Sequence, residues 1–193
     1  MSNKRKTAAK TKMKAKPTGR YARRRRIPWA PLIGAGVVLV LAFFIVRSLE
    51  LGAPGERITV AGVGQHVPEG QPVQYNSVPP VGGPHWPSPA NWGAYSVQLP
   101  NERVVHNLEH GGIVIDYNAI STDDQAKLKA IMTGYPRDQF GEVKIVLQPF
   151  DKIATGTIAL TAWGWRELLP SYNEAAIRAF LDAHMNRCCE SVP

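Results

Sequence analysis

The sequence contains little cysteine. Its two cysteines, Cys188 and Cys189, are adjacent and lie close to the C-terminus of the 193-residue chain. Because the two Cα atoms of a disulfide usually lie about 5.5 Å apart, neighbouring cysteines rarely bridge each other, and we expect no disulfide framework. The chain also has no CxxC motif, no Gly-rich phosphate loop, no Ser-His-Asp arrangement and no internal repeat. These absences exclude the common motifs of thiol redox enzymes, nucleotide-binding proteins and serine hydrolases.

Acidic residues are missing from the first 27 positions, which hold 12 of the 23 Lys and Arg residues. The rest of the chain carries 11 Lys and Arg against 15 Asp and Glu, so the isoelectric point near 9.7 describes a tail. A basic globular domain that binds nucleic acid carries its charge on its own surface. We therefore expect no nucleic-acid partner and interpret residues 1–27 as a basic cytoplasmic tail that sets membrane topology.

Charged residues are also absent from residues 28–46, which are mostly apolar. Nineteen helical residues span roughly 28 Å, close to the thickness of the bilayer's hydrocarbon region. The segment is longer than the apolar part of a signal peptide and no cleavage site follows it, so we predict an uncleaved transmembrane helix. By the positive-inside rule, residues 47–56 form a linker and residues 57–193 an extracytoplasmic domain of a single-pass protein in a bacterial cell membrane.

The exported part begins with segments that favour short strands, at residues 57–63 and 66–75. Residues 76–92 hold five of the 16 prolines. Proline fixes φ and lacks a backbone donor, so this stretch is neither a helix nor a central strand. A long rigid loop of this kind is usually functional.

The second half of the chain has more regular patterns. Ser121 and Asn173 are suitable N-caps for helices over residues 122–132 and 174–187. Apolar runs predict strands at residues 112–117, 143–149 and 157–165. The order of these elements predicts an α+β domain, a mostly antiparallel sheet with helices on one face.

Polar residues concentrate in residues 104–112, where His106, Glu109 and His110 form an H-x-x-E-H pattern. In inverted zinc metalloproteases, two such histidines bind Zn²⁺ from one helical face and the glutamate acts as general base. Gly111 and Gly112 follow at once, and we expect room for only about one helical turn. A metalloprotease needs a long helix at this motif, so the short helix argues against a metal-dependent hydrolase. We keep the hydrolase as an alternative only.

Four of the five histidines, His66, His85, His106 and His110, lie within 45 residues of one another. Imidazole binds zinc, copper, iron and nickel, and loops rich in Pro and Gly can hold such ligands rigidly. We predict that these four side chains form a transition-metal site for copper or zinc. Glu109 would fix the tautomer of one imidazole. His184, in the last predicted helix, is expected to pack or to meet solvent.

Four sequence runs resemble the bacterial family called domain of unknown function 3105 (DUF3105). They are YNSVPPVGGPH at residues 75–85, GAY at 93–95, VHNLEHG at 105–111 and TAWG at 161–164. The likeness extends over about residues 65–187. It implies anchoring by one N-terminal helix, in agreement with the topology above, and it implies no particular activity.

The sequence thus favours metal binding, or an accessory role beside a membrane protein complex, over catalysis. The lipid bilayer is the expected partner, and such a complex is a second candidate. Two alternatives stay open. One is a hydrolase with Glu109 as general base and an open coordination position on the metal. The other is a structural or interaction module whose histidines are hydrogen-bonded loop residues, with ring nitrogens more than about 6 Å from a common centre, far beyond Zn–N distances of about 2.0–2.1 Å.

Overall fold

The computed structural model describes residues 52–190 and residue 192. The predicted cytoplasmic tail, the predicted transmembrane helix and the first part of the predicted linker lie outside these residues. Within the described part, no helix combines the length and apolar character needed to cross a membrane. The elements are β1 (Glu56–Arg57), β2 (Gly93–Ala94), α2 (Asn101–Glu109), β3 (Ile113–Tyr117), α3 (Thr122–Gly134), β4 (Ile145–Pro149), β5 (Ile158–Ala162), β6 (Trp165–Leu169) and α4 (Glu174–His184).

The strands form one mixed sheet in the order β1-β6-β5-β3-β4-β2. Strand β4 pairs in parallel with both β3 and β2, whereas the pairs β3–β5, β5–β6 and β1–β6 are antiparallel. The prediction of a mostly antiparallel sheet is therefore wrong. Helix α3 connects β3 to β4, and a helical crossover returns the chain to the same edge so that the two strands run in the same direction.

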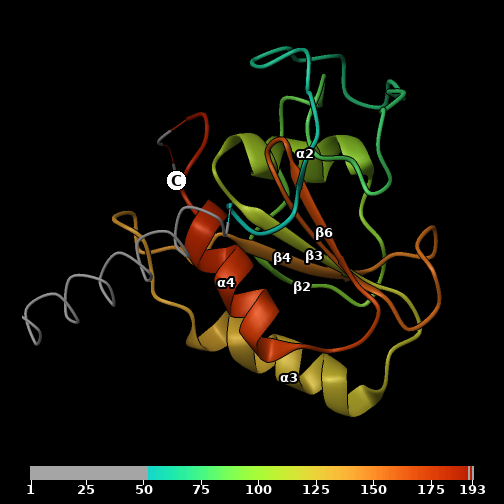
Figure 1. Ribbon diagram of the computed structural model, residues 1–193. Helices are drawn as coiled ribbons and strands as arrows, with labels where there is room; N and C mark the ends of the chain where they lie inside the picture. Colours follow the sequence, from blue (N-terminus) through green and yellow to red (C-terminus); the bar gives the residue numbers. More distant parts are fainter. Residues whose placement is uncertain (1–51, 191, 193) are drawn as a thin grey trace, which may run out of the picture. The chain divides into compact units, whose positions relative to one another are not determined.

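Helices cover both faces of the sheet, which corrects the prediction of helices on one face. Figure 1 shows α2 on one side of the strands and α3 with α4 on the other. Contacts between buried side chains give the same division, with α3 and α4 packed on one face and α2 on the opposite face. We call these the apolar face and the α2 face.

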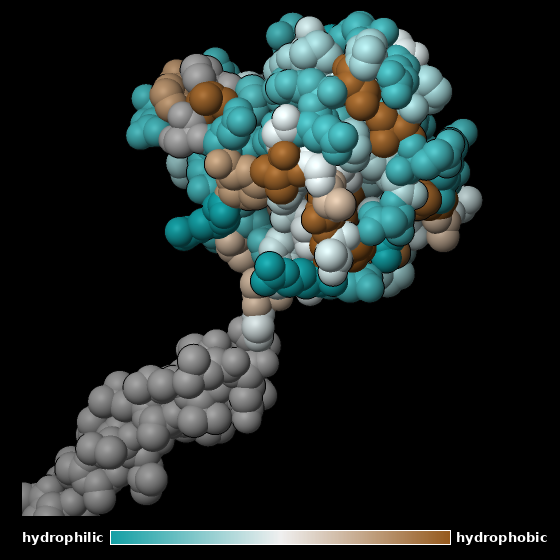
Figure 2. Space-filling model, turned by 90° about the horizontal axis from the view of Figure 1, so that it is seen from above, coloured by the Kyte–Doolittle hydropathy of each residue, from teal (hydrophilic) through white to brown (hydrophobic). Residues whose placement is uncertain are grey.

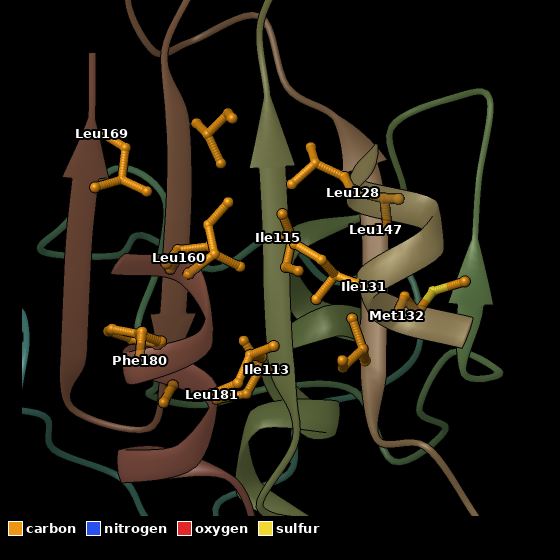
Figure 3. Packing of buried hydrophobic residues seen from close by; sticks show 14 residues of the cluster. Ile113, Ile115, Leu128, Ile131, Met132, Leu147, Leu160, Leu169, Phe180 and Leu181 are labelled. Atoms are coloured by element: carbon orange, nitrogen blue, oxygen red, sulfur yellow. The ribbon is translucent and has the colours of Figure 1, made fainter. Parts of the chain in front are cut away.

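The main hydrophobic core lies on the apolar face. Side chains from the strands and from α3 and α4 point toward one another there, among them Ile115, Leu160, Ile131 and Phe180 (Figure 3). All four are almost fully buried. Because side chains alternate between the two faces of a strand, every second residue of β3 and β5 enters this core.

Helices α3 and α4 begin where the sequence predicted. The Ser121 hydroxyl accepts a hydrogen bond from the Asp124 N–H, and the Asn173 side chain accepts one from the Ala176 N–H. Both contacts satisfy a backbone donor that the first helical turn leaves unpaired. Helix α2 differs from expectation, since it has nine residues rather than about one turn.

Three strand predictions need correction. The predicted strand over residues 157–165 is two strands, β5 and β6, joined by a turn at Gly164, whose φ is +75°. The predicted strand at residues 66–75 is reduced to one bridge between His66 and His85, and that at 57–63 to Arg57. Cys188 and Cys189 are joined in a disulfide, which links adjacent residues and so provides no disulfide framework for the fold.

The visible surface offers no large apolar patch as a guide to function. Figure 2 shows mainly hydrophilic residues on one side of the molecule, with hydrophobic residues in small, separate groups. Single exposed apolar side chains are normal on soluble domains. A buried polar side chain is the more informative observation, and several of them surround α2.

Candidate metal centre

Helix α2 carries buried polar residues because it is enclosed on two sides. Val104 and Leu108 pack on Val114 and Val146 of the sheet. His106 and Glu109, three positions apart, share another side of the helix, which is covered by the proline-rich loop. Both side chains are buried, and Glu109 is fully so.

Asn107 fixes the loop to the helix. Its side chain accepts a hydrogen bond from the Ala90 N–H at 2.9 Å and donates one to the Ala90 carbonyl at 2.8 Å. The buried amide thus satisfies both of its polar atoms and holds the end of the loop against α2.

The proline-rich loop, residues 76–92, carries His85 and brings it next to His66, which lies 19 positions earlier in the sequence. The Val67 N–H donates to the His85 carbonyl at 2.8 Å, and the His85 N–H donates to the Gln65 carbonyl at 3.1 Å. The chain passes through Gly82 and Gly83, with φ of +144° and +126°, just before His85. A side chain at Gly82 would meet Val60 and Trp163, so the close approach of the loop requires glycine there.

Three of the four predicted ligands converge with Glu109. One nitrogen each from His66, His85 and His106 and one oxygen from Glu109 lie within 4.8 Å of one another, and this group could hold a metal ion. We call it the inner group. Its side chains are buried except for His66, which is exposed. The fourth predicted ligand, His110, is not a member, but its Nε2 lies 3.0 Å from Nε2 of His106.

One contact in the inner group places two acceptors face to face. His85 Nδ1 lies 2.8 Å from the Gly83 carbonyl, which can only accept, so Nδ1 carries the proton. In the neutral ring, Nε2 then presents a lone pair. It lies 3.0 Å from Oε2 of Glu109, and among the described residues neither atom has a hydrogen-bond partner. A cation between these atoms would satisfy both.

The other oxygen of the Glu109 carboxylate already accepts a hydrogen bond. Its Oε1 accepts a hydrogen bond from the Gly64 N–H at 2.5 Å. Gly64 has a φ of +66°, in the left-handed region that glycine adopts without strain. The loop that carries His66 is therefore fastened to the carboxylate it faces.

His106 is held in the same manner as His85. Its Nδ1 donates to the Trp86 carbonyl at 2.7 Å, which leaves the lone pair on Nε2. Burial lowers the pKa of His106 to about 4, and the neighbouring imidazoles lower it too, while the hydrogen bond to Trp86 acts in the opposite direction. At neutral pH the ring is uncharged, which is the form that binds metals.

A further ring of contacts fixes the loop segment that follows His66. The Val73 N–H donates to Glu102 at 2.9 Å, the Trp86 indole N–H donates to the Gln71 carbonyl at 2.8 Å, and Arg103 pairs with Glu69. Sequence reasoning did not find these positioning groups, because they are backbone atoms or common surface residues without a motif.

His184 lies apart from the inner group. Its ring packs near Trp165 and Phe180, and its Nε2 donates to the Pro54 carbonyl at 2.7 Å. Burial lowers its pKa. Packing was one of the two outcomes expected for this residue.

The fold and the inner group define a class: a mixed α/β domain with a buried His and Glu cluster that could hold a metal ion. The chain belongs to the family described as protein of unknown function (DUF3105), whose sequence profile matches residues 66–191. This membership confirms the resemblance seen in the sequence. No curated protein and no solved structure matches the chain.

Proposed function

We propose that this chain is a membrane-anchored metal-binding protein whose inner group holds one divalent transition-metal ion. The observation that carries the proposal is the 3.0 Å approach of His85 Nε2 to Glu109 Oε2, both buried and without a hydrogen-bond partner among the described residues. Buried polar atoms are almost always satisfied in native proteins, so an unpaired pair of acceptors favours a cation. The nitrogens of His66 and His106 would complete the ligand set.

The donor types support zinc or copper(II). Imidazole nitrogen suits both ions, and a carboxylate oxygen is a common additional ligand for zinc. The inner group contains no sulfur donor, and the soft thiolate or thioether ligands that select copper(I) are therefore not part of it. Zinc and copper(II) consequently remain the two metals to test.

The arrangement favours binding over hydrolysis. Catalytic zinc sites usually have three protein ligands and one open position, whereas closed sites with four protein ligands are structural. Here four side chains converge, and Glu109 is engaged by the Gly64 N–H on one oxygen and faces His85 with the other. A general base needs a carboxylate that is free to reach a metal-bound water.

The alternative of a purely structural module is disfavoured by the same distances. That alternative expects histidine nitrogens that are far apart or satisfied by backbone groups. The donor atoms of His66, His85 and His106 lie within 4.8 Å of one another, and the backbone groups contact Nδ1 of His85 and His106, so Nε2 of each ring is not satisfied by the backbone.

Elemental analysis of the full chain tests this function. The protein is purified in detergent without a His-tag, reconstituted with zinc or copper(II), and compared with a His66→Ala/His106→Ala variant. A His184→Gln variant is the matched control, because His184 lies outside the inner group. We expect about one equivalent of metal in the wild type and the control, and loss of it in the double variant. Absence of bound metal from the reconstituted wild type would contradict the proposal.

We also propose that residues 28–46 anchor the chain and that the inner group lies on the extracytoplasmic side, in an accessory role beside a membrane complex. The charge asymmetry around residues 28–46 supports this topology. Protease treatment of intact spheroplasts should degrade residues 57–193 and leave the N-terminal tail protected. Protection of the domain until the cells are lysed would contradict the orientation.

A further inference from the structure

We propose that His110 and Glu190 form an outer station for the metal, through which a divalent transition-metal ion enters and leaves the inner group. This inference rests on the proposed function, because it requires an inner ion to exchange. It assigns a role to the predicted ligand that the inner group leaves out.

The distances place the outer station beside one inner donor. Nε2 of His110 lies 3.0 Å from Nε2 of His106 and 3.8 Å from Oε2 of Glu190. The side chains of His110 and Glu190 are 13% and 48% exposed, against 0% and 1% for His85 and Glu109. Donor groups thus continue from the buried site to the solvent without a gap.

The chain holds Glu190 in this place by backbone contacts. The Glu190 N–H donates to the Glu109 carbonyl at 3.2 Å, and the Asn186 N–H donates to the Gly111 carbonyl at 2.8 Å. The C-terminal segment therefore runs along the end of α2 (Figure 1). Gly111 makes this approach possible, because a Cβ there would lie 2.8 Å from the Cys188 carbonyl oxygen and its φ is +78°.

The buried Lys144 side chain also holds the C-terminal segment against the end of α2. The Lys144 ammonium donates to the His110 carbonyl at 3.1 Å and to the Val192 carbonyl, and it pairs with Asp138 at 3.3 Å. One side chain thereby ties the residue after α2 to the C-terminal segment. His110 and Glu190 are consequently held together by the fold, whereas two surface side chains that meet by chance have no such support.

The contact between the two imidazoles provides a route for ligand exchange. His106 keeps its proton on Nδ1, so its Nε2 accepts a hydrogen bond from Nε2 of His110 when no ion is bound. An ion on His106 takes the place of that hydrogen bond. When it leaves, the bond from the metal to His106 Nε2 breaks and a bond to His110 Nε2 forms. His110 gives its Nε2 proton to solvent and takes one up on Nδ1, so the imidazole stays neutral and the ion stays divalent. The Glu190 carboxylate stabilises the ion at this outer position.

The rate of metal transfer tests the station. The zinc-loaded full chain in detergent is mixed with excess colorimetric chelator, and the transfer is followed by stopped-flow absorbance. Glu190→Gln removes one charge and is expected to keep about one equivalent of zinc while slowing transfer by about tenfold, the scale of outer ligand partners. His110→Ala is expected to slow transfer at least as much. Asp151→Asn removes an exposed carboxylate from the chain just after β4, at the opposite end of the sheet, and should leave the rate unchanged.

The possible results separate the two proposals. Normal zinc content with wild-type transfer rates in both variants would overturn the outer station and leave the inner site intact. Loss of stoichiometric zinc from Glu190→Gln would also overturn it, because Glu190 would then be an inner ligand. A wild type that binds no zinc or copper(II) would overturn the proposed function and this inference with it.

Discussion

The two faces of the sheet bury different kinds of side chain. On the apolar face, α3 and α4 cover a continuous cluster of buried aliphatic and aromatic side chains. On the α2 face, the buried apolar cluster is much smaller, and His85, His106, Asn107, Glu109 and Asp116 are buried beside it. The first face provides most of the hydrophobic stability, and the second places polar groups where water cannot compete for them. The comparison implies that stability and metal binding can be disturbed separately.

The largest expected effect is a loss of stability from the apolar face. Phe180 is fully buried against the strands, so Phe180→Ala should lower the free energy of unfolding by about 3–5 kcal/mol. Chemical denaturation monitored by circular dichroism measures this change. Leu168→Ala is the control, because Leu168 is 47% exposed and its loss should cost less than about 0.5 kcal/mol. Equal effects of the two variants would contradict the division between the faces.

The second effect is a pH dependence that arises on the α2 face. Asp116 lies on the same face of β3 as Val114. Burial raises the pKa of Asp116 to about 7, although a hydrogen bond from Gln148 acts to lower it. Between pH 4 and 7 the native state holds a proton that the unfolded state has lost. Stability should therefore fall by on the order of a few kcal/mol as the pH rises through this range.

Asp116→Asn isolates this contribution, since the amide cannot ionise. Denaturation midpoints measured between pH 4 and 8 should vary less in the variant than in the wild type. Identical profiles would show that Asp116 is ionised in the native protein over the whole range, contrary to its burial.

The third effect links the inner group to stability. A metal that binds the native state at 100 times its dissociation constant should stabilise the wild type by about 2.7 kcal/mol. Glu109→Gln keeps an oxygen for the Gly64 N–H but loses the negative charge that faces His85. It should lose most of the stabilisation by zinc, as measured by thermal unfolding with and without the ion. Retention of the full effect would mean that zinc binds elsewhere.

The smallest effect concerns a helix terminus on the apolar face. The Asn173 side chain caps α4, so Asn173→Ala should cost about 1 kcal/mol of unfolding free energy. Metal content should not change, because this end of the helix contributes nothing to the inner group. Denaturation and elemental analysis of the same preparation check both statements, and a coupled loss of metal would contradict the separation of the faces.

The same division explains which parts of the fold could be predicted. Helices α3 and α4 carry local signals, an N-cap followed by apolar residues at helical spacing. Helix α2 begins after Pro100 without a capping side chain and buries polar residues, so its pattern is atypical. The parallel pairing of β3 with β4 depends on the direction in which α3 returns the chain to the sheet. The apolar pattern of a single strand does not predict that direction.

The candidate site was predictable in composition and less so in geometry. Histidines on a rigid loop and in the H-x-x-E-H pattern indicated the right neighbourhood. The bridge between His66 and His85 is a tertiary contact with no local pattern, and it decides which nitrogens meet. Glu109 was expected beside an imidazole, and the structure places its carboxylate against His85 and within the inner group itself. Only the fold separates His110 from that group.

X-ray absorption spectroscopy of the metal-loaded full chain tests the central claim most directly. With zinc or copper(II), we predict that three imidazole nitrogens and one carboxylate oxygen bind the ion, at about 2.0–2.2 Å for zinc, with no sulfur ligand. The Glu109→Gln variant should show weaker binding with the three imidazoles retained. A sulfur ligand, or a shell made of water without imidazole, would contradict the assignment of His66, His85, His106 and Glu109 as the metal site.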